Sequence, residues 1–283
     1  LELGDTNQPL LKELMNKAPG TFHHSMHVAN LAESAASAIG AKALLSRVGA
    51  LYHDIGKILK PEYYVENQSS GVNEHDKLKP QMSAMVIKAH VSEGIKIAQE
   101  AGLPNKLIDF ISTHHGTSVI RYFFEKAKDN DSMKEVTAEE KFRYDGPLPA
   151  TKETGILLLA DGIEAASRAM KSPTYPRLEN LVNRMVDERV KEGQLGHCPL
   201  TFRDLQLIKE AFMNVLMGIY HHRVEYPEDK TQQNTDADPK SEASVDSKAE
   251  ASVDSKAEAN KGPENNGETP SSDESANSEP TKQ

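Results

Sequence analysis

The chain has 283 residues, of which 37% are hydrophobic and 27% are charged, with 43 acidic against 33 basic side chains. At a typical ~150 residues per domain, this length allows one large domain or two small ones. Residues 228–283 contain 14 acidic and 6 basic side chains, which leaves residues 1–227 nearly neutral. Duplex nucleic acid is therefore not expected as a partner, because its binding depends on a strongly basic surface.

Residues 228–283 are predicted to form a disordered acidic tail. They include no aromatic residue, and Ala and Val are their only aliphatic types. An eight-residue polar repeat, residues 243–250 and again 251–258, has no apolar face to bury. Such a segment cannot bury enough apolar surface to offset the entropy lost on ordering. We therefore divide the chain into a domain of residues 1–227 and a tail of residues 228–283.

Cysteine content and hydropathy exclude two further classes of protein. Cys198 is the only cysteine, so neither an intrachain disulfide nor a cysteine-rich zinc module can form. No apolar run approaches the roughly 20 residues that a membrane span requires, and no signal peptide opens the sequence. The first residue is Leu rather than Met, so we expect a piece of a longer protein, with room for membrane segments upstream.

Apolar residues recur at helical spacing along residues 1–227, and strand-like alternation is almost absent. We expect Thr21 to cap the first histidine-bearing helix, directly after a Pro-Gly turn. Polar loops are expected over residues 61–80 and 129–149, the second with at most one short helix. The predicted helices span residues 21–39, 43–55, 83–102, 104–115, 154–170, 177–191 and 202–222. The predicted fold class is therefore all-α.

The histidines are the main candidates for a functional site. All eleven lie in residues 1–227. Imidazole is the commonest protein ligand for transition metals. Several of these side chains, together with two aspartates, lie on or at the end of apolar helix faces, where a polar group needs a partner. The candidate ligands are His24, His53, Asp54, His90, His114, His115 and Asp161.

Asp161 interrupts the most apolar helix of the sequence. An unpaired buried carboxylate costs several kcal/mol, so Asp161 needs a cation, which is either Arg168 or a metal. Seven ligands exceed what one tetrahedral ion can use, but they fit two octahedral ions that share a carboxylate. Mixed imidazole and carboxylate ligands favour iron, manganese, zinc or cobalt. By spacing alone, His23, His24 and His27 remain alternative ligands on the first helix.

The ordered set of these residues resembles the HD superfamily of metal-dependent phosphohydrolases. The resemblance rests on His24, His53-Asp54-Ile-Gly-Lys57 and Asp161, and the added His90 and His114-His115 resemble its dinuclear branch. Residues 21–25, 66–68, 142–147 and 159–166 are similar to motifs of the seven-transmembrane HD family. The match covers about residues 8–226 and implies an HD-domain helical bundle with a dinuclear metal site. The acidic tail has no counterpart in this pattern.

The resemblance also implies a division of the ligands. By position, one metal is bound by His24, His53, Asp54 and Asp161, and the other by Asp54, His90, His114 and His115, so that Asp54 bridges the two. The family pattern selects His24 over its two neighbours on the first helix. The expected cofactors are two transition-metal ions, with iron or manganese favoured. His75 lies in a polar loop and is a weaker candidate ligand.

Characterised members of the seven-transmembrane HD family hydrolyse the second messenger cyclic di-AMP, and their HD domain is the cytoplasmic end of a membrane protein. The resemblance therefore implies a cytoplasmic domain of a membrane-anchored protein that converts cyclic di-AMP to linear pApA. A hydroxide shared by the two metals is the expected nucleophile. Lys57 is a candidate for binding the phosphate or assisting the leaving oxygen, although a lysine at a helix end is often only solvated. Arg143 and Arg168 are candidates for phosphate contact, and Asn67 for a polar contact with substrate.

Two other interpretations remain open. The first is a related enzyme, either a cyclic di-GMP phosphodiesterase or a nucleotide phosphohydrolase. The cyclic di-GMP branch carries a Gly-Tyr-Pro extension after its histidine pair, and residues 114–118 lack it. A mononuclear nucleotidase would leave three histidines unexplained. The second is a non-catalytic cyclic-dinucleotide sensor, although such degenerate modules usually lose ligands, and all seven are present here.

Overall fold

The computed structural model of this protein describes residues 2–68, 73–129 and 139–220. Throughout those ranges the regular elements are helices, and the single β-bridge, between Val119 and Arg143, belongs to no strand. The prediction of an all-α fold is therefore confirmed. The predicted tail, residues 228–283, and its boundary with the domain lie outside the described residues.

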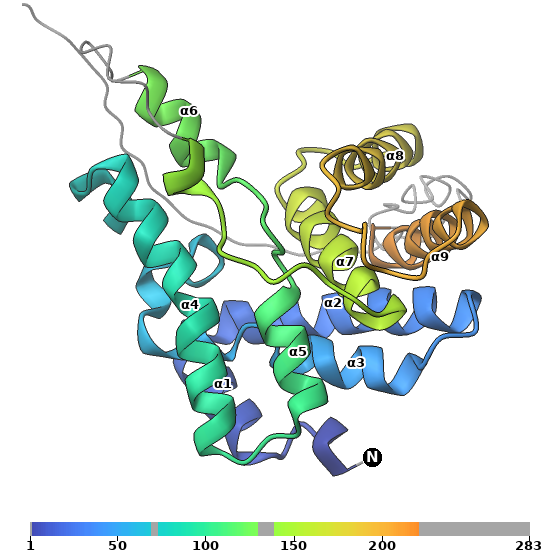
Figure 1. Ribbon diagram of the computed structural model, residues 1–283, viewed down its shortest axis with the longest axis horizontal. Coiled ribbons are helices and arrows are strands. Elements are labelled where there is room, and N and C mark those ends of the chain that lie inside the picture. The colour runs from blue at the N-terminus through green and yellow to red at the C-terminus, as the bar shows by residue number, and fades with distance from the viewer. Residues whose placement is uncertain (1, 69–72, 130–138, 221–283) are drawn as a thin grey trace, which may run out of the picture. The chain divides into compact units, whose positions relative to one another are not determined.

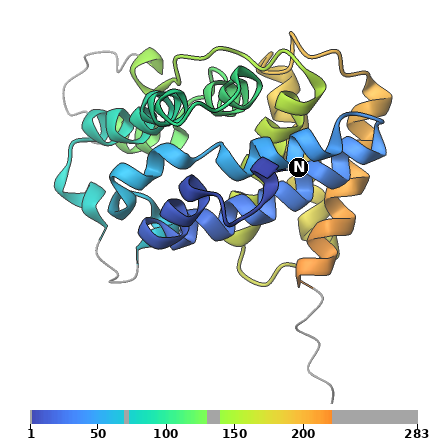
Figure 2. The ribbon, with the colours of Figure 1, turned by 90° about the horizontal axis from the view of Figure 1, so that it is seen from below.

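The α-helices in chain order are α1 (Pro9–Lys17), α2 (Pro19–Ala38), α3 (Ala43–Tyr52), α4 (Pro80–Glu100), α5 (Asn105–Thr113), α6 (Arg121–Asp129), α7 (Lys152–Arg168), α8 (Tyr175–Lys191) and α9 (Phe202–Tyr220). Short 3₁₀ helices join them: η1 (Glu2–Gly4), η2 (Ile55–Leu59), η3 (Pro61–Tyr63), η4 (Val65–Asn67), η5 (Glu74–Lys77) and η6 (Glu139–Phe142). Figures 1 and 2 place α4 and α5 towards one end of α2, and α9 towards the other end. No helix within the described ranges is both long enough and apolar enough to cross a membrane.

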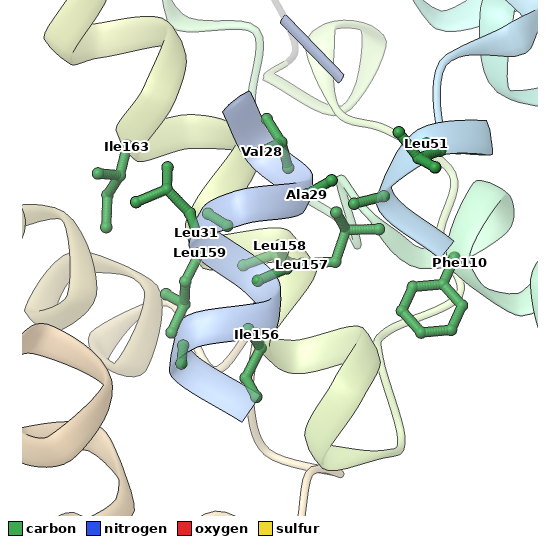
Figure 3. Close-up of a cluster of buried hydrophobic side chains, with 14 of the residues drawn as sticks. Val28, Ala29, Leu31, Leu51, Phe110, Ile156, Leu157, Leu158, Leu159 and Ile163 are labelled. Carbon is green, nitrogen blue, oxygen red and sulfur yellow. The ribbon is translucent and has the colours of Figure 1, made fainter. Parts of the chain in front are cut away.

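Helix α2 is the centre of the hydrophobic core. It packs against α3, α7 and α9, and its Val28, Ala29 and Leu31 are fully buried. Figure 3 shows these side chains close to those of Ile156, Leu157, Leu158, Leu159 and Ile163 on α7. Full burial of an aliphatic side chain contributes about 1.5–3 kcal/mol. The interface therefore fixes α2 and α7, which carry two of the candidate ligands, relative to each other.

The structure corrects two predicted helix ends. We expected Thr21 to cap α2, but the helix begins at Pro19 and Thr21 lies within it. Proline suits the first helical turn because its missing N–H would be unpaired there in any case. The side chain of Thr21 donates a hydrogen bond to Glu66 Oε1 at 3.1 Å instead. Helix α3 ends at Tyr52, before the expected end near residue 55, and a 3₁₀ helix follows it.

Helices α1 and α6 were not predicted. Each has nine residues and buries only two or three side chains, Leu11 and Leu14 on α1 and Phe123, Phe124 and Ala127 on α6. So few apolar positions do not define a helical period in the sequence, whereas the equally short α5 was predicted from its starting proline and its apolar residues. The aromatic residues of α6 form a small separate core with α4 and η6. That second core supports the segment after residue 142, which leads back towards the candidate site.

Gly56 lets η2 approach α4 closely. A Cβ at this position would lie 1.9 Å from the backbone oxygen of His90 and 2.6 Å from the backbone nitrogen of Gly94. Both atoms belong to the backbone of α4, so the clash can be relieved only by moving that helix. The contact sets the distance between the His53-Asp54 pair and His90, because Gly56 lies only two residues after Asp54.

Gly56→Ala is therefore expected to lower the free energy of unfolding by about 1–3 kcal/mol, as measured by urea denaturation. The matched control is Gly218→Ala on α9, where a Cβ would meet no atom within 4 Å. Alanine is a better helix former than glycine by about 1 kcal/mol, so this control should be neutral or stabilising. Equal effects of the two substitutions would show that the approach of η2 to α4 is not tightly packed.

Candidate metal centre

The seven candidate ligands meet in one place although they come from five separate helices. His24 lies on α2, His53 and Asp54 directly follow α3, His90 lies on α4, His114 and His115 directly follow α5, and Asp161 lies on α7. All of these side chains except His115 belong to buried residues. A group of buried imidazoles and carboxylates is stable only when its members satisfy one another or bind a cation.

Three groups of side chains each place three possible ligand atoms within 4.8 Å of one another. The first group is His24, His53 and Asp161, and the second is His90, His114 and His115. The third group is His53, Asp54 and His114, which takes one histidine from each of the other two. The arrangement offers two neighbouring positions for metal ions with Asp54 between them.

The two oxygens of Asp54 face different groups. Oδ2 lies 3.2 Å from His53 Nε2 and 3.7 Å from His24 Nε2. Oδ1 lies 3.3 Å from His90 Nε2 and 3.6 Å from His114 Nε2. One carboxylate thus presents one oxygen to each group, which is the geometry that a bridging ligand requires.

Three of the histidines are oriented by backbone carbonyls one helical turn earlier. His53 Nδ1 donates to the oxygen of Ala50 at 2.7 Å, His90 Nδ1 to Ile87 at 2.5 Å, and His114 Nδ1 to Ile111 at 2.7 Å. These hydrogen bonds place the proton on Nδ1 and leave Nε2 facing the centre. A metal-bound imidazole is usually held in this way by a partner behind it.

His24 is held differently, by a side chain that the sequence did not single out. Its Nδ1 donates to Glu164 on α7, while its Nε2 lies 3.0 Å from Asp161 Oδ1. Glu164 is buried and also contacts His27, whose Nδ1 lies 3.4 Å away, and Arg168, whose guanidinium lies 3.7 Å away. The signal that we overlooked is spacing, since Glu164 follows Asp161 by one helical turn and so faces the same side of α7.

We expect Glu164→Gln to weaken metal binding about 10- to 100-fold, because a carboxylate behind a ligating histidine fixes its orientation and raises its basicity. Metal affinity is to be measured by competition with a chromogenic chelator. Glu153→Gln, on the same helix, is the matched control and should leave the affinity unchanged. Unaltered affinity in a folded Glu164→Gln protein would show that His24 needs no such support.

The electrostatics of the centre favour the metal-binding forms of its two carboxylates and of His90. Burial opposes the charge on His24 and His53, but the neighbouring carboxylates raise the pKa of both, that of His53 to about 10, so a metal bound there would displace a proton. Burial opposes the ionisation of Asp54, but the charges of His53 and Lys57 hold its pKa well below the usual range. Burial similarly opposes ionisation of Asp161, whose pKa is nevertheless held low by the hydrogen bond from His24. Burial lowers the pKa of His90 to about 3. Ionised carboxylates and neutral imidazoles are the forms that act as ligands.

The residues present fit a pair of metal ions. Both oxygens of Asp54 and Nε2 of His53 are buried and make no hydrogen bond of good geometry within the described part of the chain, and Oδ2 of Asp54 has only the ion pair with Lys57, at 2.7 Å. Buried polar atoms without partners are rare and costly, and each of these three atoms faces the centre. Bound cations would satisfy all three. The donor set of imidazoles and carboxylates suits divalent transition metals.

Lys57 lies at the edge of this centre. Its Nζ is 2.7 Å from Asp54 Oδ2 and 2.9 Å from Glu66 Oε1. Burial opposes the charge on Lys57, but these two carboxylates hold its pKa well above the usual range, so the side chain is a fixed cation. Asn67 is nearby, and its side chain accepts a hydrogen bond from the backbone N–H of Thr21 at 3.0 Å. This network ties η4 to the start of α2.

The structure separates the other predicted contact residues from the ligands. The guanidinium of Arg143 binds the backbone oxygen of Thr117 at 3.0 Å and pairs with Glu139. Arg168 lies beside Glu164, on the side of α7 that borders a surface cavity. His75, the weaker candidate ligand, lies 2.9 Å from the backbone oxygen of Tyr63 through its Nε2 and is in none of the three ligand groups.

Tyr144 is a second residue of the site that the sequence did not single out. Its ring stacks on His115, with 4.1 Å between ring centroids and an interplanar angle of 23°. Burial raises the pKa of Tyr144, so its hydroxyl stays protonated. The residue lies in the segment 142–147 that we matched to a family motif, but a motif match alone gives no contact. The structure therefore adds an aromatic surface beside the least buried histidine ligand.

The fold agrees with comparisons to known proteins. Residues 21–166, more than half of the chain, match the model of the HD domain family. The protein therefore belongs to the HD domain family, and the resemblance noted in the sequence is confirmed. It is 45% identical over 228 residues to the cyclic-di-AMP phosphodiesterase PgpH of Bacillus subtilis, a match that covers 81% of this chain and 32% of that protein. The chain thus spans about a third of the length of this relative.

Two solved structures are similar over most of the domain. The crystal structure of the Listeria monocytogenes phosphodiesterase PgpH HD domain superposes with a TM-score of 0.72 at 44% identity. The match covers 76% of this chain and 100% of the crystallised chain. The same HD domain in complex with cyclic-di-AMP superposes with a TM-score of 0.71 at 44% identity, covering 77% of this chain and 100% of that one.

Proposed function

We propose that this domain is a phosphodiesterase that hydrolyses cyclic di-AMP to linear pApA. The observation that supports it best is the position of Asp54, which presents one oxygen to each of two histidine groups. Relatives at 44–45% identity are named as cyclic-di-AMP phosphodiesterases, and one related domain has been solved with that nucleotide. A paired-metal site is suited to displacement at phosphorus, because each ion can stabilise one of the two reacting oxygens.

In the proposed reaction, a water molecule attacks one phosphorus of the ring and the bond from that phosphorus to the 3′ oxygen breaks. The hydroxyl of the water remains on the phosphate, and its proton ends on the 3′ oxygen. When bound, the metal ions supply a water that ionises near neutral pH. Lys57 is assigned to a phosphate oxygen or to the leaving oxygen, since it is a fixed cation beside the bridging carboxylate.

The proposed cofactors are two transition-metal ions per chain, iron or manganese. The five histidines argue against magnesium and calcium, which prefer oxygen ligands. The side chains of Asn67, Arg143 and Arg168, the other proposed substrate contacts, are already engaged in contacts within the protein. Arg143 would have to leave Glu139, and Arg168 would have to turn from Glu164, before either could reach a phosphate.

The test is chromatography of products from a panel of nucleotides incubated with the metal-loaded protein. The panel contains cyclic di-AMP, cyclic di-GMP, linear pApA, ATP and a short RNA strand. We expect pApA from cyclic di-AMP as the main product, with at least tenfold lower turnover of the other compounds. Faster turnover of cyclic di-GMP or ATP would select a related enzyme. Tight binding of cyclic di-AMP with no product, in protein that holds two metals, would select a sensor.

We further propose that the domain is the cytoplasmic part of a membrane-anchored protein. The support is the similarity of residues 21–25, 66–68, 142–147 and 159–166 to the seven-transmembrane HD family. Fractionation of cells that produce the protein from its complete gene tests this, with the domain detected by an antibody. Recovery in the membrane fraction, with the domain protected from protease outside intact cells, is the expected result.

A further inference from the structure

Lys57 contacts two carboxylates at the edge of the metal centre, and the two differ in what else they can bind. Its Nζ lies 2.7 Å from Asp54 Oδ2 and 2.9 Å from Glu66 Oε1. Oδ2 of Asp54 also lies 3.2 Å from His53 Nε2, so it is one of the atoms that would hold a metal ion. Glu66 belongs to none of the three ligand groups. One partner of Lys57 is thus shared with the metals, and the other is not.

We propose that Glu66 is a positioning residue that keeps Lys57 beside the metal centre when a metal ion takes up the Asp54 oxygen. The proposal rests on the proposed function and deepens it, because it assigns a role to a carboxylate that touches neither metal nor substrate. Three observations support it: the competition for Asp54, the attachment of Glu66 to α2 and the confinement of Lys57.

Lys57 and a metal ion would compete for the same oxygen of Asp54. The side chain of Asp54 is 1% exposed, so two cations that approach it repel each other with little screening by solvent. A metal ion at Oδ2 therefore weakens the hold of Asp54 on Lys57. The other oxygen, Oδ1, faces His90 and His114 and is no substitute. Glu66 is then the carboxylate that keeps Lys57 in place.

Glu66 is suited to this role because it is attached to the helix that carries His24. Its Oε1 accepts a hydrogen bond from the Thr21 hydroxyl at 3.1 Å, and the same hydroxyl accepts one from Asn67 Nδ2 at 2.9 Å. The backbone lies equally close, since a Cβ at Gly20 would be 1.8 Å from the backbone oxygen of Glu66. Gly20 and Thr21 are among the first residues of α2, so Glu66 keeps a fixed position relative to the ligand His24.

The charged end of Lys57 has little freedom to move elsewhere. The side chain is 12% exposed, and its Nζ lies 4.9 Å from the centre of the Tyr64 ring, whose face attracts a cation. Asp54 and Glu66 are its only carboxylate partners within the described part of the chain. Removal of the charge of Glu66 would therefore leave Lys57 with Asp54 alone, in direct competition with the metal.

The first experiment measures metal affinity by competition with a chromogenic chelator. Glu66→Gln keeps the size of the side chain and an oxygen for Thr21 but loses the charge. We expect it to weaken Mn²⁺ binding about 3- to 10-fold, because Lys57 then remains on Asp54. Lys57→Met should strengthen binding by a similar factor, and Glu66→Gln should have no further effect in that background. Glu62→Gln, at an exposed residue of η3, is the matched control and should leave the affinity unchanged.

The second experiment measures hydrolysis of cyclic di-AMP and of bis(p-nitrophenyl) phosphate, a simple diester, at saturating Mn²⁺. A carboxylate near an anionic substrate repels it, so the loss of the charge alone should lower KM. We expect Glu66→Gln instead to lower kcat/KM about tenfold for both substrates, because Lys57 is no longer held where it can contact the phosphodiester. Lys57→Met should cause a loss at least as large, and the addition of Glu66→Gln should not increase it.

The outcomes separate this proposal from the proposed function. A protein that hydrolyses the simple diester but not cyclic di-AMP contradicts the proposed substrate, while the same variants still decide the role of Glu66. A protein that binds no Mn²⁺ contradicts both. Equal losses from Glu66→Gln with and without Lys57 would show that Glu66 acts on the fold or on the metals directly, and would overturn the proposal.

Glu66→Asp is the second variant, because it keeps the charge and shortens the side chain by one methylene. In both measurements it should fall between the unmodified protein and Glu66→Gln. A folded Glu66→Asp protein that performs no better than Glu66→Gln would overturn the proposal even where Lys57→Met fails to fold.

Discussion

Asp54→Asn is expected to lower the turnover of cyclic di-AMP by at least ~10³-fold, which corresponds to about 4 kcal/mol in transition-state free energy. The substitution keeps the size of the side chain but removes the charge that offsets two cations. It also replaces one of the two oxygens with an amide nitrogen, which cannot act as a ligand. Both metal positions should therefore lose occupancy, as measured by elemental analysis of the purified protein.

Two comparisons make this result specific to the bridge. His24→Ala should reduce the metal content at one position directly, because His24 lies in one ligand group only. Asp109→Asn, an exposed residue on α5, should change neither metal content nor turnover. Circular dichroism checks that each variant is folded. A folded Asp54→Asn protein with two metals and near-normal turnover would show that another group joins the two ions.

His90→Ala is expected to reduce the metal content from two ions to about one and to abolish measurable turnover. His90 and His114 together face one oxygen of Asp54, with their Nε2 atoms 3.1 Å apart, so the loss of one imidazole leaves that position short of ligands. The other position keeps His24, His53 and Asp161, and the metal there should remain. Metal content after loading with Mn²⁺ or Fe²⁺ measures the difference.

The matched control is His197→Ala, at an exposed residue of the loop before α9. It should keep two ions and full turnover. The metal content of the unmodified protein is measured in the same way. A content of one ion per chain after loading with Mn²⁺ or Fe²⁺ would contradict the dinuclear site. Retention of two ions by folded His90→Ala would show that His114, His115 and Asp54 suffice for the second position.

The long helices of the fold were the most predictable of its elements. The long helices α2, α4, α7 and α9 each repeat their apolar spacing over several turns, so they were expected close to their observed bounds. The nine-residue α1 and α6 were missed because two or three buried positions do not define a period, whereas α5, which is equally short, was expected from Pro104 at its start and from Leu107, Ile108 and Ile111. The start of α2 was misplaced because Thr21 has the chemistry of a cap, whereas its real partner, Glu66, is distant in sequence.

The candidate ligands were predictable because polar side chains on apolar helix faces stand out in a sequence. The two residues that support them were not, since Glu164 lies behind His24 and Tyr144 lies on His115. A carboxylate in an amphipathic helix and a tyrosine in a polar loop have many ordinary roles. Only the packing of α2 on α7 and the course of the segment after residue 142 show what each of them touches.

By itself, the sequence determined the all-α class and the residue types that meet in the candidate metal centre, because helical periodicity and the chemistry of imidazole and carboxylate are local properties. The tertiary structure decided how Asp54 lies between the two histidine groups and which ligands face solvent. It also decided that a cavity adjoins His115. These features depend on the distances between helices that are far apart in the chain, and the distances are set by packing, as at Gly56, where the lack of a side chain allows η2 to approach α4.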